Sequence, residues 1–382
     1  MNRRQMLTSA SLALALAPLA QARCAEFRTQ WKVRTSEGFD AICFTNPLSG
    51  DPFYADYYAK ELAAFKPRLR AETLSTIEKR FKLAQSRGVL LGPTLCTMMS
   101  GAPDASLDDL IAALSDPERI VRPPLENSPY WDPDEWPIFL ELCLDFVKIF
   151  ADFRAAGFAE FRSAYVDPRG AKKLPALRAR LSGMDTIAEQ ERLLGRKFPD
   201  PSLEIILLYF SKPHGIKIQG QRFLTHIDYP DEIVIRNADH EMLHPPFDMN
   251  GATSLAVQAA LKSDPLFVKI VNEHDKRFGY NSFEGVLNED TVQALEQIVN
   301  ERLGVAEPPA QRWKDSDDGM HVFAAGLYGL LKADGYDKTG GNIGVWMASA
   351  LKSGRLAPAS LHTAAARILQ RPADRLWPLP KA

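Results

Sequence analysis

His240-Glu241-Met242-Leu243-His244 carries the strongest structural signal in the chain. Two histidines four positions apart lie on one face of a helix, one turn above each other, which is the spacing that a single zinc ion requires. The glutamate between them is placed to take a proton from a metal-activated water. The segment therefore predicts a short helix that supplies two metal ligands and a general base.

The residues before this helix have the pattern of β-strands. Leu203-Glu204-Ile205-Ile206-Leu207-Leu208-Tyr209-Phe210 is rich in strand-forming residues, and Pro213-His214-Gly215 interrupts it. Ile216 to Ile227 and Glu232 to Ile235 are expected to form further strands, and Asn237 suits the N-cap of the helix that follows. We therefore expect strands within about 203–236 and the metal helix at about 237–245.

Both flanks of this region have a helical pattern. Ser106 is an N-cap candidate, Val121 to Pro137 is too rich in proline for regular helix, and Gly157 is expected to end or bend a strongly apolar helix that contains Phe139. The chain is expected to be helical again from Asn250 to near Gln370. The sequence thus predicts an α+β, mostly helical fold. A helical N-terminal lobe (23–195) precedes a region (196–382) with a small β-sheet packed on the metal helix.

The N-terminus has the pattern of an export signal. Arg3 and Arg4 precede an apolar run from Met6 to Ala20, and Ala20-Gln21-Ala22 is a small-x-small cleavage site. The paired arginines are similar to a twin-arginine signal. We expect a signal peptide at 1–22 and a periplasmic or secreted protein; an uncleaved signal anchor is the alternative. After cleavage, no apolar stretch approaches the length of a stable membrane span.

The composition is that of an ordinary globular protein, with 46% hydrophobic and 25% charged residues. Removing Arg3 and Arg4 would change the formal charge from −2 to −4, which favours neither nucleic acid nor an anionic membrane as a partner. The four cysteines (Cys24, Cys43, Cys96, Cys143) have no C-x-x-C spacing. Their pairing stays open, and Cys96 and Cys143 have the apolar surroundings of buried thiols.

Strands, a helix with H-E-x-x-H and then an all-helical portion resemble the zincin metallopeptidases over about 200–300. One group of zincins, the gluzincins, has a G-x-x-N-E segment. In this chain, that segment is similar to Gly285-Val286-Leu287-Asn288-Glu289. The resemblance implies a bound Zn²⁺ held by His240, His244 and Glu289, which lies 45 positions after His244 (289 − 244). It also implies that the edge strand of the sheet holds an extended peptide.

Several features leave alternatives open. Glu289 is expected to open a helix, so that the alternative to a metal ligand is a first-turn acid favoured by the helix dipole; Glu284, Glu273 and Asp275 are then the reserve ligands. Thermolysin-like proteins have an aspartate four residues after the glutamate to orient a zinc histidine, where this chain has Gln293; Asp239 and Asp248 are possible substitutes. Pro245 requires the metal helix to end at or near His244.

Hydrolysis also needs a hydrogen-bond donor to the developing oxyanion. His321 and Tyr280 are the candidates, with Tyr328 as an equal rival, and each has a purely structural role as its alternative. The remaining histidines are expected to be structural or exposed: His214 and His226 in the strand region, His274 on a solvated helix face, and His362 without an identifiable partner. The aromatic segment from Asp51 to Tyr58 either lines a cleft or, more simply, packs in the core.

These patterns predict an exported zinc metallopeptidase in which Glu241 is the general base and the substrate is a peptide or protein. Two other classes remain open. One is an exported binding or scaffold protein with a structural or absent zinc site. The other is a zinc hydrolase that acts on a non-peptide amide, because the chemistry at zinc would be the same.

Overall fold

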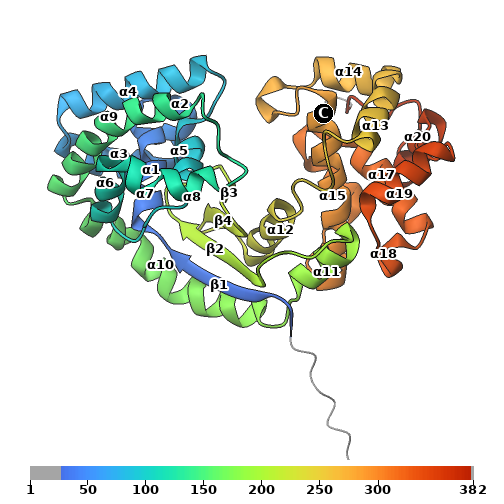
Figure 1. Ribbon diagram of the computed structural model, residues 1–382, viewed down its shortest axis with the longest axis horizontal. Coiled ribbons are helices and arrows are strands. Elements are labelled where there is room, and N and C mark those ends of the chain that lie inside the picture. The colour runs from blue at the N-terminus through green and yellow to red at the C-terminus, as the bar shows by residue number, and fades with distance from the viewer. Residues whose placement is uncertain (1–26, 380–382) are drawn as a thin grey trace, which may run out of the picture.

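The computed structural model describes residues 27–379, so the expected signal peptide at 1–22 and Cys24 lie outside the described residues. The fold is mostly helical with one small four-stranded sheet, as the sequence predicts. Figure 1 shows two helical lobes on either side of this sheet. In the described part of the chain, no helix combines the length and apolar character needed to cross a bilayer.

The N-terminal lobe contains strand β1 (Gln30–Thr35) and the helices up to α10. Their bounds are α1 Glu37–Leu48, α2 Pro52–Ala55, α3 Ala59–Phe65, α4 Ala71–Ser86, α5 Leu91–Met99, α6 Leu107–Ser115, α7 Pro117–Ile120, α8 Arg122–Glu126, α9 Trp136–Ala155 and α10 Phe158–Leu181, with 3-10 turns η1 Asp56–Tyr58 and η2 Lys66–Arg68. Ser106 caps α6 through a reciprocal pair of hydrogen bonds with Asp109, and Gly157, at φ 75°, separates α9 from α10. Both predictions are thereby confirmed.

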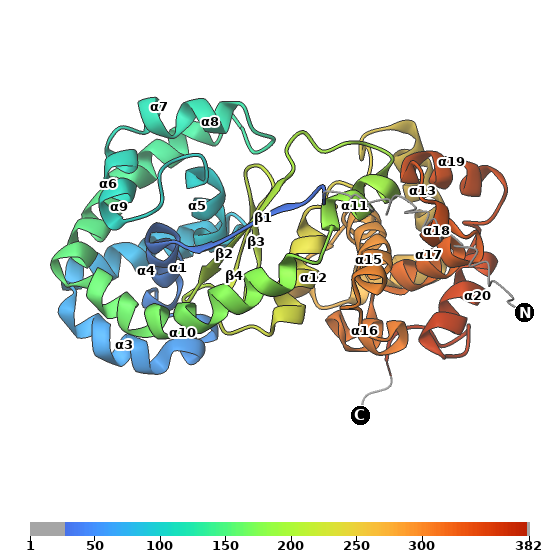
Figure 2. The same cartoon turned by 90° about the horizontal axis from the view of Figure 1, so that it is seen from below.

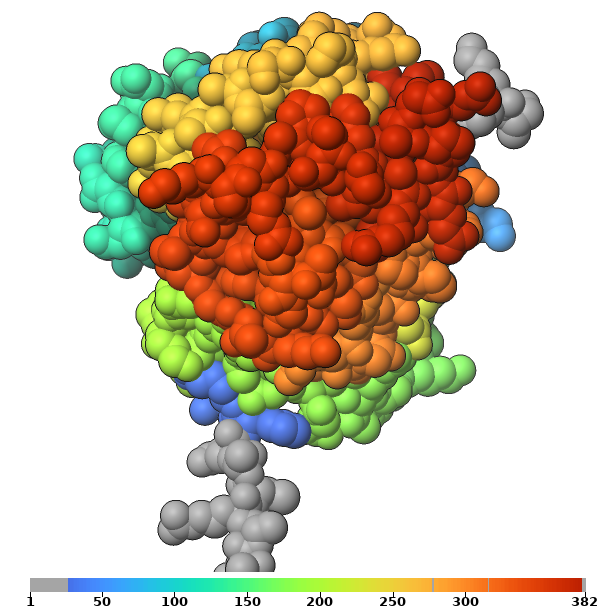
Figure 3. All heavy atoms as spheres, turned by 90° about the vertical axis from the view of Figure 1, so that its right-hand side faces the viewer, coloured from blue at the N-terminus to red at the C-terminus, as the bar shows by residue number. Residues whose placement is uncertain are grey.

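The rest of the chain contributes three strands and the helices of the C-terminal lobe. In order, these are α11 Thr186–Leu194, β2 Ser202–Leu208, β3 Ile216–Ile218, β4 Arg222–His226, α12 Asp231–Glu241, α13 Ala252–Lys262, α14 Pro265–Glu273, η3 Lys276–Phe278, α15 Phe283–Leu303, α16 Pro309–Asp315, η4 Asp317–Gly319, α17 Val322–Ala333, α18 Tyr336–Thr339, α19 Ile343–Lys352 and α20 Pro358–Leu369. Figure 3 shows the outer face of this lobe, most of which is formed by the segments that follow α15.

The sheet has the order β1-β2-β4-β3. β1 and β4 both run parallel to β2, with Val33 opposite Ile205 and Ile206 opposite Leu224. β3 is antiparallel to β4 and forms an edge, with Lys217 opposite Phe223. Because β1 comes from residues 30–35, the sheet uses residues from both sides of the boundary expected near 195. α10 runs beneath β1, as Figure 2 shows.

The expected strand at 232–235 is wrong, because these residues lie inside α12. The metal helix begins at Asp231 rather than near 237, and it ends at Glu241. Val234, Ile235 and Ala238 are buried at helical spacing, so the short apolar run reflects one buried helix face. The early end of the helix agrees with the expectation from Pro245.

Two hydrophobic cores meet at the end of α12. The first contains the N-terminal lobe, the sheet and the buried face of α12 as far as Met242. The second begins with Leu193 and Leu194, and includes Leu243 and the C-terminal helices around α15. Met242 and Leu243 are neighbours in the sequence but belong to different cores. The segment that carries the two histidines therefore lies at the junction of the lobes.

Candidate metal centre

His240 lies in the last turn of α12, and His244 follows just beyond the end of this helix. Lys217 on the edge strand β3 holds this end in place: its Nζ donates to the carbonyl oxygens of Glu241 at 2.6 Å and His244 at 2.9 Å. Burial lowers the pKa of Lys217 to about 8, which leaves it largely protonated at neutral pH. A lysine thus satisfies carbonyl groups that the truncated helix leaves without partners.

Glu289 comes from α15, the central helix of the C-terminal lobe. α15 begins at Phe283, and Ser282 caps it by accepting a hydrogen bond from Gly285 N. Glu289 therefore does not open the helix, as expected from the sequence, but lies in its second turn. Its side chain is buried, with the residue only 6% exposed, so that the first-turn alternative does not apply.

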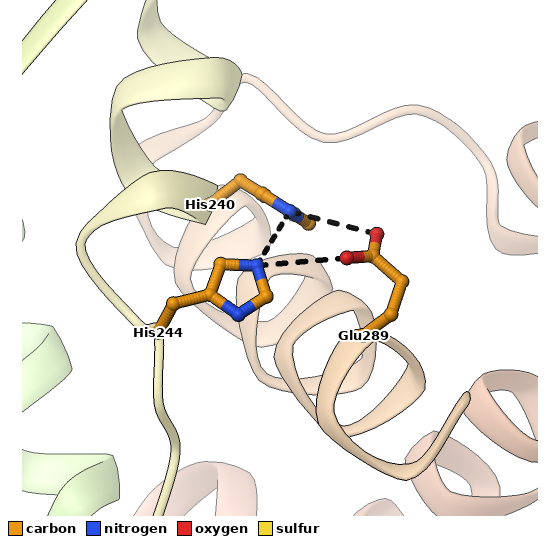
Figure 4. A group of neighbouring side chains, drawn as sticks. All are labelled: His240, His244 and Glu289. Carbon is orange, nitrogen blue, oxygen red and sulfur yellow. Dashed lines mark hydrogen bonds and ion pairs between the residues drawn. The ribbon is translucent and has the colours of Figure 1, made fainter. Parts of the chain in front are cut away.

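The three side chains converge on one point, as Figure 4 shows. The two Nε2 atoms of His240 and His244 are 3.1 Å apart, and each lies 3.5 Å from one carboxylate oxygen of Glu289. One ligand atom from each residue lies within 4.8 Å of the others. Two imidazole nitrogens and a carboxylate are the donor set of a three-ligand zinc site.

The second nitrogen of each imidazole fixes its tautomer. Nδ1 of His240 lies 3.0 Å from the Glu296 carboxylate, and Nδ1 of His244 lies 3.1 Å from Oδ1 of Asn288. Both partners accept hydrogen bonds, so both Nδ1 atoms must donate. In neutral rings this leaves two Nε2 lone pairs that face each other and the Glu289 carboxylate. Such an arrangement is unfavourable without a cation between them, and the residues therefore fit a metal ion.

The electrostatics of the group agree with this reading. Burial would raise the pKa of Glu289, but the charges of His240 and His244 and their hydrogen bonds outweigh it and hold the pKa well below the usual range. Burial would lower the pKa of His240, but Glu289 and Glu296 raise it well above the usual range. The two carboxylates therefore favour a positive charge at this position.

Glu296 was not identified from the sequence. Its carboxylate accepts hydrogen bonds from the two terminal nitrogens of the Arg312 guanidinium group, at 2.9 and 2.5 Å, and from Nδ2 of Asn300 at 2.8 Å. Its pKa falls to about 2 because the attraction of Arg312, together with His240, exceeds the cost of burial. Glu296 is therefore ionised, and it orients the ring of His240, a candidate metal ligand.

The residues that the sequence suggested for orienting a histidine ligand do not contact His240 or His244 in this way. Gln293 donates to Glu289 at 2.9 Å and accepts from the Trp313 indole at 2.9 Å, so that it orients the carboxylate ligand rather than a histidine. Asp239 is fully buried, and Asp248 accepts from Asn250 N. The signal that would have found Glu296 is a buried polar stripe on α15, at Glu289, Gln293, Glu296 and Asn300.

The two candidate oxyanion donors differ in their surroundings. Tyr280 hydrogen-bonds to Glu289, and burial with the nearby carboxylates raises its pKa far above the usual value, which keeps the phenol protonated. His321 is buried with its ring nitrogens 2.6 Å from Asp290 and 2.9 Å from Asp317. These carboxylates overcome the effect of burial and raise the pKa of His321 to about 10. His321 thus acts as a charged clamp between α15 and η4.

The remaining candidates do not join the group. Tyr328 donates to Glu301, and the reserve ligands Glu284 and Glu273 are exposed. His274 is buried between the carbonyls of Ile270 and Gly279, so that the expected solvated position is wrong, and His362 has a partner in Asp264 at 2.8 Å. His214 contacts the Tyr54 hydroxyl at 2.8 Å. In the aromatic segment from Asp51 to Tyr58, Tyr54 and Tyr58 pack in the core, while Phe53 and Tyr57 are exposed.

Glu241 lines an open hollow of about 400 Å³ together with His240, one of the three candidate ligands. The hollow is also lined by Gln293, Glu296 and Arg312, and it is therefore strongly polar. The motif glutamate thus lies on an accessible surface next to the donor set.

Comparisons with protein-family models, with curated proteins and with solved structures found no match to this chain.

Proposed function

We propose that the protein is an exported zinc-dependent peptidase. The observation that carries the proposal is the convergence of two imidazole lone pairs and a buried carboxylate on one point, with Glu241 on the accessible side of the same turn. His240, His244 and Glu289 would hold the ion. A zinc ion supplies Lewis acidity, which acidifies water and polarises a carbonyl group.

The residues of the chain have separate roles in this proposal. Glu241 takes the proton of the attacking water and passes it to the leaving amine. Tyr280 is protonated and only half-buried beside Glu289, whereas His321 is fully buried, so that Tyr280 is the better placed donor for the developing oxyanion. His321 has both ring nitrogens engaged by carboxylates, so that we assign it to positioning α17 and η4 rather than to substrate.

The edge strand supports a peptide as the substrate. β3 is at the end of the sheet order, and Lys217 ties it to the turn that carries His244. An extended peptide added along such an edge gains main-chain hydrogen bonds regardless of its sequence, and its scissile bond comes close to the metal histidines. This arrangement is similar to the zincin plan and favours a peptide over a small non-peptide amide.

The first test is the metal content of the purified mature protein, prepared without added zinc. We expect about one zinc per chain, lost or strongly weakened in Glu289→Ala and retained in Glu284→Ala, an exposed acid of the same helix. Absence of metal in the wild-type protein, with no tight uptake when zinc is supplied, would contradict the proposal. A binding or scaffold role would then be favoured.

The second test separates metal binding from catalysis. Glu241→Gln should retain the zinc but lose peptide hydrolysis by a factor of about 10² to 10⁴, because the amide cannot accept the proton of water. Metal analysis and cleavage of a mixed peptide library measure the two effects on the same preparation. A variant with wild-type turnover would rule out Glu241 as the base.

A further inference from the structure

The N-terminal lobe contains an apolar pocket that no step of the proposed reaction uses. It has a volume of about 470 Å³, within the range of ligand sites, and lies between α4, α5, α8 and the start of α9. Leu91, Leu95, Met98, Leu125, Phe139 and Leu142 form most of its wall. Figures 1 and 2 both show α5 and α8 on the side of the N-terminal lobe that faces α12.

The edge strand connects this pocket to the metal centre. One face of β3 contacts the end of the metal helix through Lys217, while α5, a wall of the pocket, packs against β3. Just after the strand, Gln219 N donates to Ser100 Oγ at the end of α5, at 3.2 Å. β3 has three residues, which span about 10 Å. A peptide that follows β3 from the metal site would therefore run toward α5, which lines the pocket.

Tyr130 is a polar residue in the wall of the pocket. It lines the pocket from the loop after α8. Burial, with a smaller effect of the Glu241 carboxylate, raises the pKa of Tyr130 to about 12. The phenol of Tyr130 therefore stays protonated at neutral pH and can donate a hydrogen bond within the pocket.

The charges around the pocket indicate what it would bind. Its two arginines are already paired: Arg80 with Asp145 at 2.6 Å and Arg87 with Glu135 at 2.5 Å. The lining also contains Asp132, which would repel an anion. Neither arginine is thus left to recognise an acidic group, and the walls are mainly apolar.

We propose that this pocket is the specificity pocket of the protein and accepts a bulky apolar side chain, of leucine, methionine or phenylalanine size, from a peptide that lies along β3. The inference deepens the proposed function and rests on it for the identification of the ligand as a substrate. Its physical basis is the burial of apolar area, since a side chain larger than alanine by several methylene groups gains roughly 10-fold or more in affinity.

The experiment measures binding of short blocked peptides that differ at one position, Phe, Leu, Ala or Asp, to the Glu241→Gln protein, with and without a chelator. We expect the Phe and Leu peptides to bind at least about 10-fold more tightly than the Ala peptide, and the Asp peptide most weakly. Leu142→Trp, which fills the pocket from α9, should remove this preference. Leu144→Trp is the matched control, because Leu144 lies on the same helix but is 71% exposed.

Equal binding of all four peptides, or a preference that Leu142→Trp leaves unchanged, would overturn the inference. If Leu142→Trp does not fold by circular dichroism, Thr94→Trp fills the pocket from α5 and replaces it. The two proposals fail separately. A binding preference without zinc-dependent cleavage refutes the peptidase and retains the pocket, whereas cleavage without side-chain preference retains the peptidase and refutes the pocket.

Discussion

At the scale of single residues, the candidate site depends on the partners of its ligands as much as on the ligands. Glu296 fixes the ring of His240, Asn288 fixes that of His244, and Gln293 donates to Glu289. Arg312 in turn compensates the buried charge of Glu296. Each ligand is therefore held in one orientation before an ion binds, which reduces the entropy lost on binding.

We expect Glu296→Gln to weaken zinc binding by about 10- to 100-fold without removing any of the three ligands. The amide loses the negative charge that increases the basicity of His240, and it leaves Arg312 without its carboxylate. Competition with a chelator of known affinity measures the change. Glu301→Gln, on the same helix but outside the site, is the control, and an equal loss in both variants would contradict a specific role for Glu296.

A second residue-scale prediction concerns acid stability. His226 is 1% exposed and accepts a hydrogen bond from Asp228 N through Nδ1. Burial lowers its pKa from 6.5 to about 4. Because the unfolded state then binds the proton more tightly, the stability contribution is complete above pH 6.5 and is lost as the pH falls to 4. The loss amounts to about 3 kcal/mol at 1.36 kcal/mol per pKa unit.

His226→Asn keeps an acceptor for Asp228 N but cannot take up a proton in this range. Urea unfolding of both proteins at pH 7, 5.5 and 4 should therefore show a smaller loss of stability with falling pH in the variant. All other titrating groups are shared and cancel in the difference. Parallel pH profiles would show that His226 does not contribute to acid unfolding.

At the scale of elements, α15 is the helix that organises the C-terminal lobe. It is buried on nearly every side, and one polar stripe within it supplies Glu289, Gln293, Glu296 and Asn300. The same helix thus contributes core packing, a candidate metal ligand and the residues that orient the candidate ligands. α12 and the turn that follows it contribute the two histidines, so that packing of α12 on α15 sets their distance from Glu289.

Ser282→Ala tests whether the start of α15 influences the site. Loss of the cap should lower the free energy of unfolding by about 1 kcal/mol, while Ser282→Gly costs only a few tenths. Zinc affinity should not change, because Glu289 lies in the second turn and is fixed by side-chain contacts. Chemical denaturation measures the free energy of unfolding, and a zinc titration measures the affinity. A loss of zinc affinity together with the loss of stability would mean that fraying of the start of α15 extends to Glu289.

At the scale of the whole molecule, the candidate metal centre lies where the two cores meet, and the sheet belongs to the first of these cores. A buried ion pair secures the sheet in the N-terminal lobe. Asp40 on α1 accepts from the backbone N–H groups of Tyr209 and Phe210, at 2.7 and 2.9 Å, and from Arg162 on α10 at 2.7 Å. The end of β2, α1 and α10 are thereby fixed to one carboxylate.

Asp40→Asn should destabilise the protein by about 3–5 kcal/mol, because Arg162 would remain buried without its counter-ion. The exposed pair of Arg154 and Asp108 gives the comparison, and Asp108→Asn should cost less than about 1 kcal/mol. Denaturant unfolding at constant pH measures both. Similar values for the two variants would show that Asp40 is less important to the fold than its contacts indicate.

The sequence by itself determined those features that depend on neighbouring residues. The spacing of His240 and His244, the end of the metal helix before Pro245, the cap at Ser106 and the break at Gly157 all follow from local backbone and side-chain geometry. Glu289 was also identified from neighbouring residues, because 285–289 resembles the G-x-x-N-E segment of the gluzincins. Whether the group binds zinc and hydrolyses peptides is still a prediction.

Only the tertiary structure decided the features that join distant segments. It paired β1 with β2 across more than 160 positions, placed residues 232–235 in a helix, and brought Glu296, Arg312 and Lys217 around the site. A short apolar run has no periodicity that separates strand from helix, and a buried polar residue has no local sign of its partner. Packing of the two cores decides both the helical state of 232–235 and the partners of the buried polar residues, because it determines which faces are buried and which charged groups come into contact.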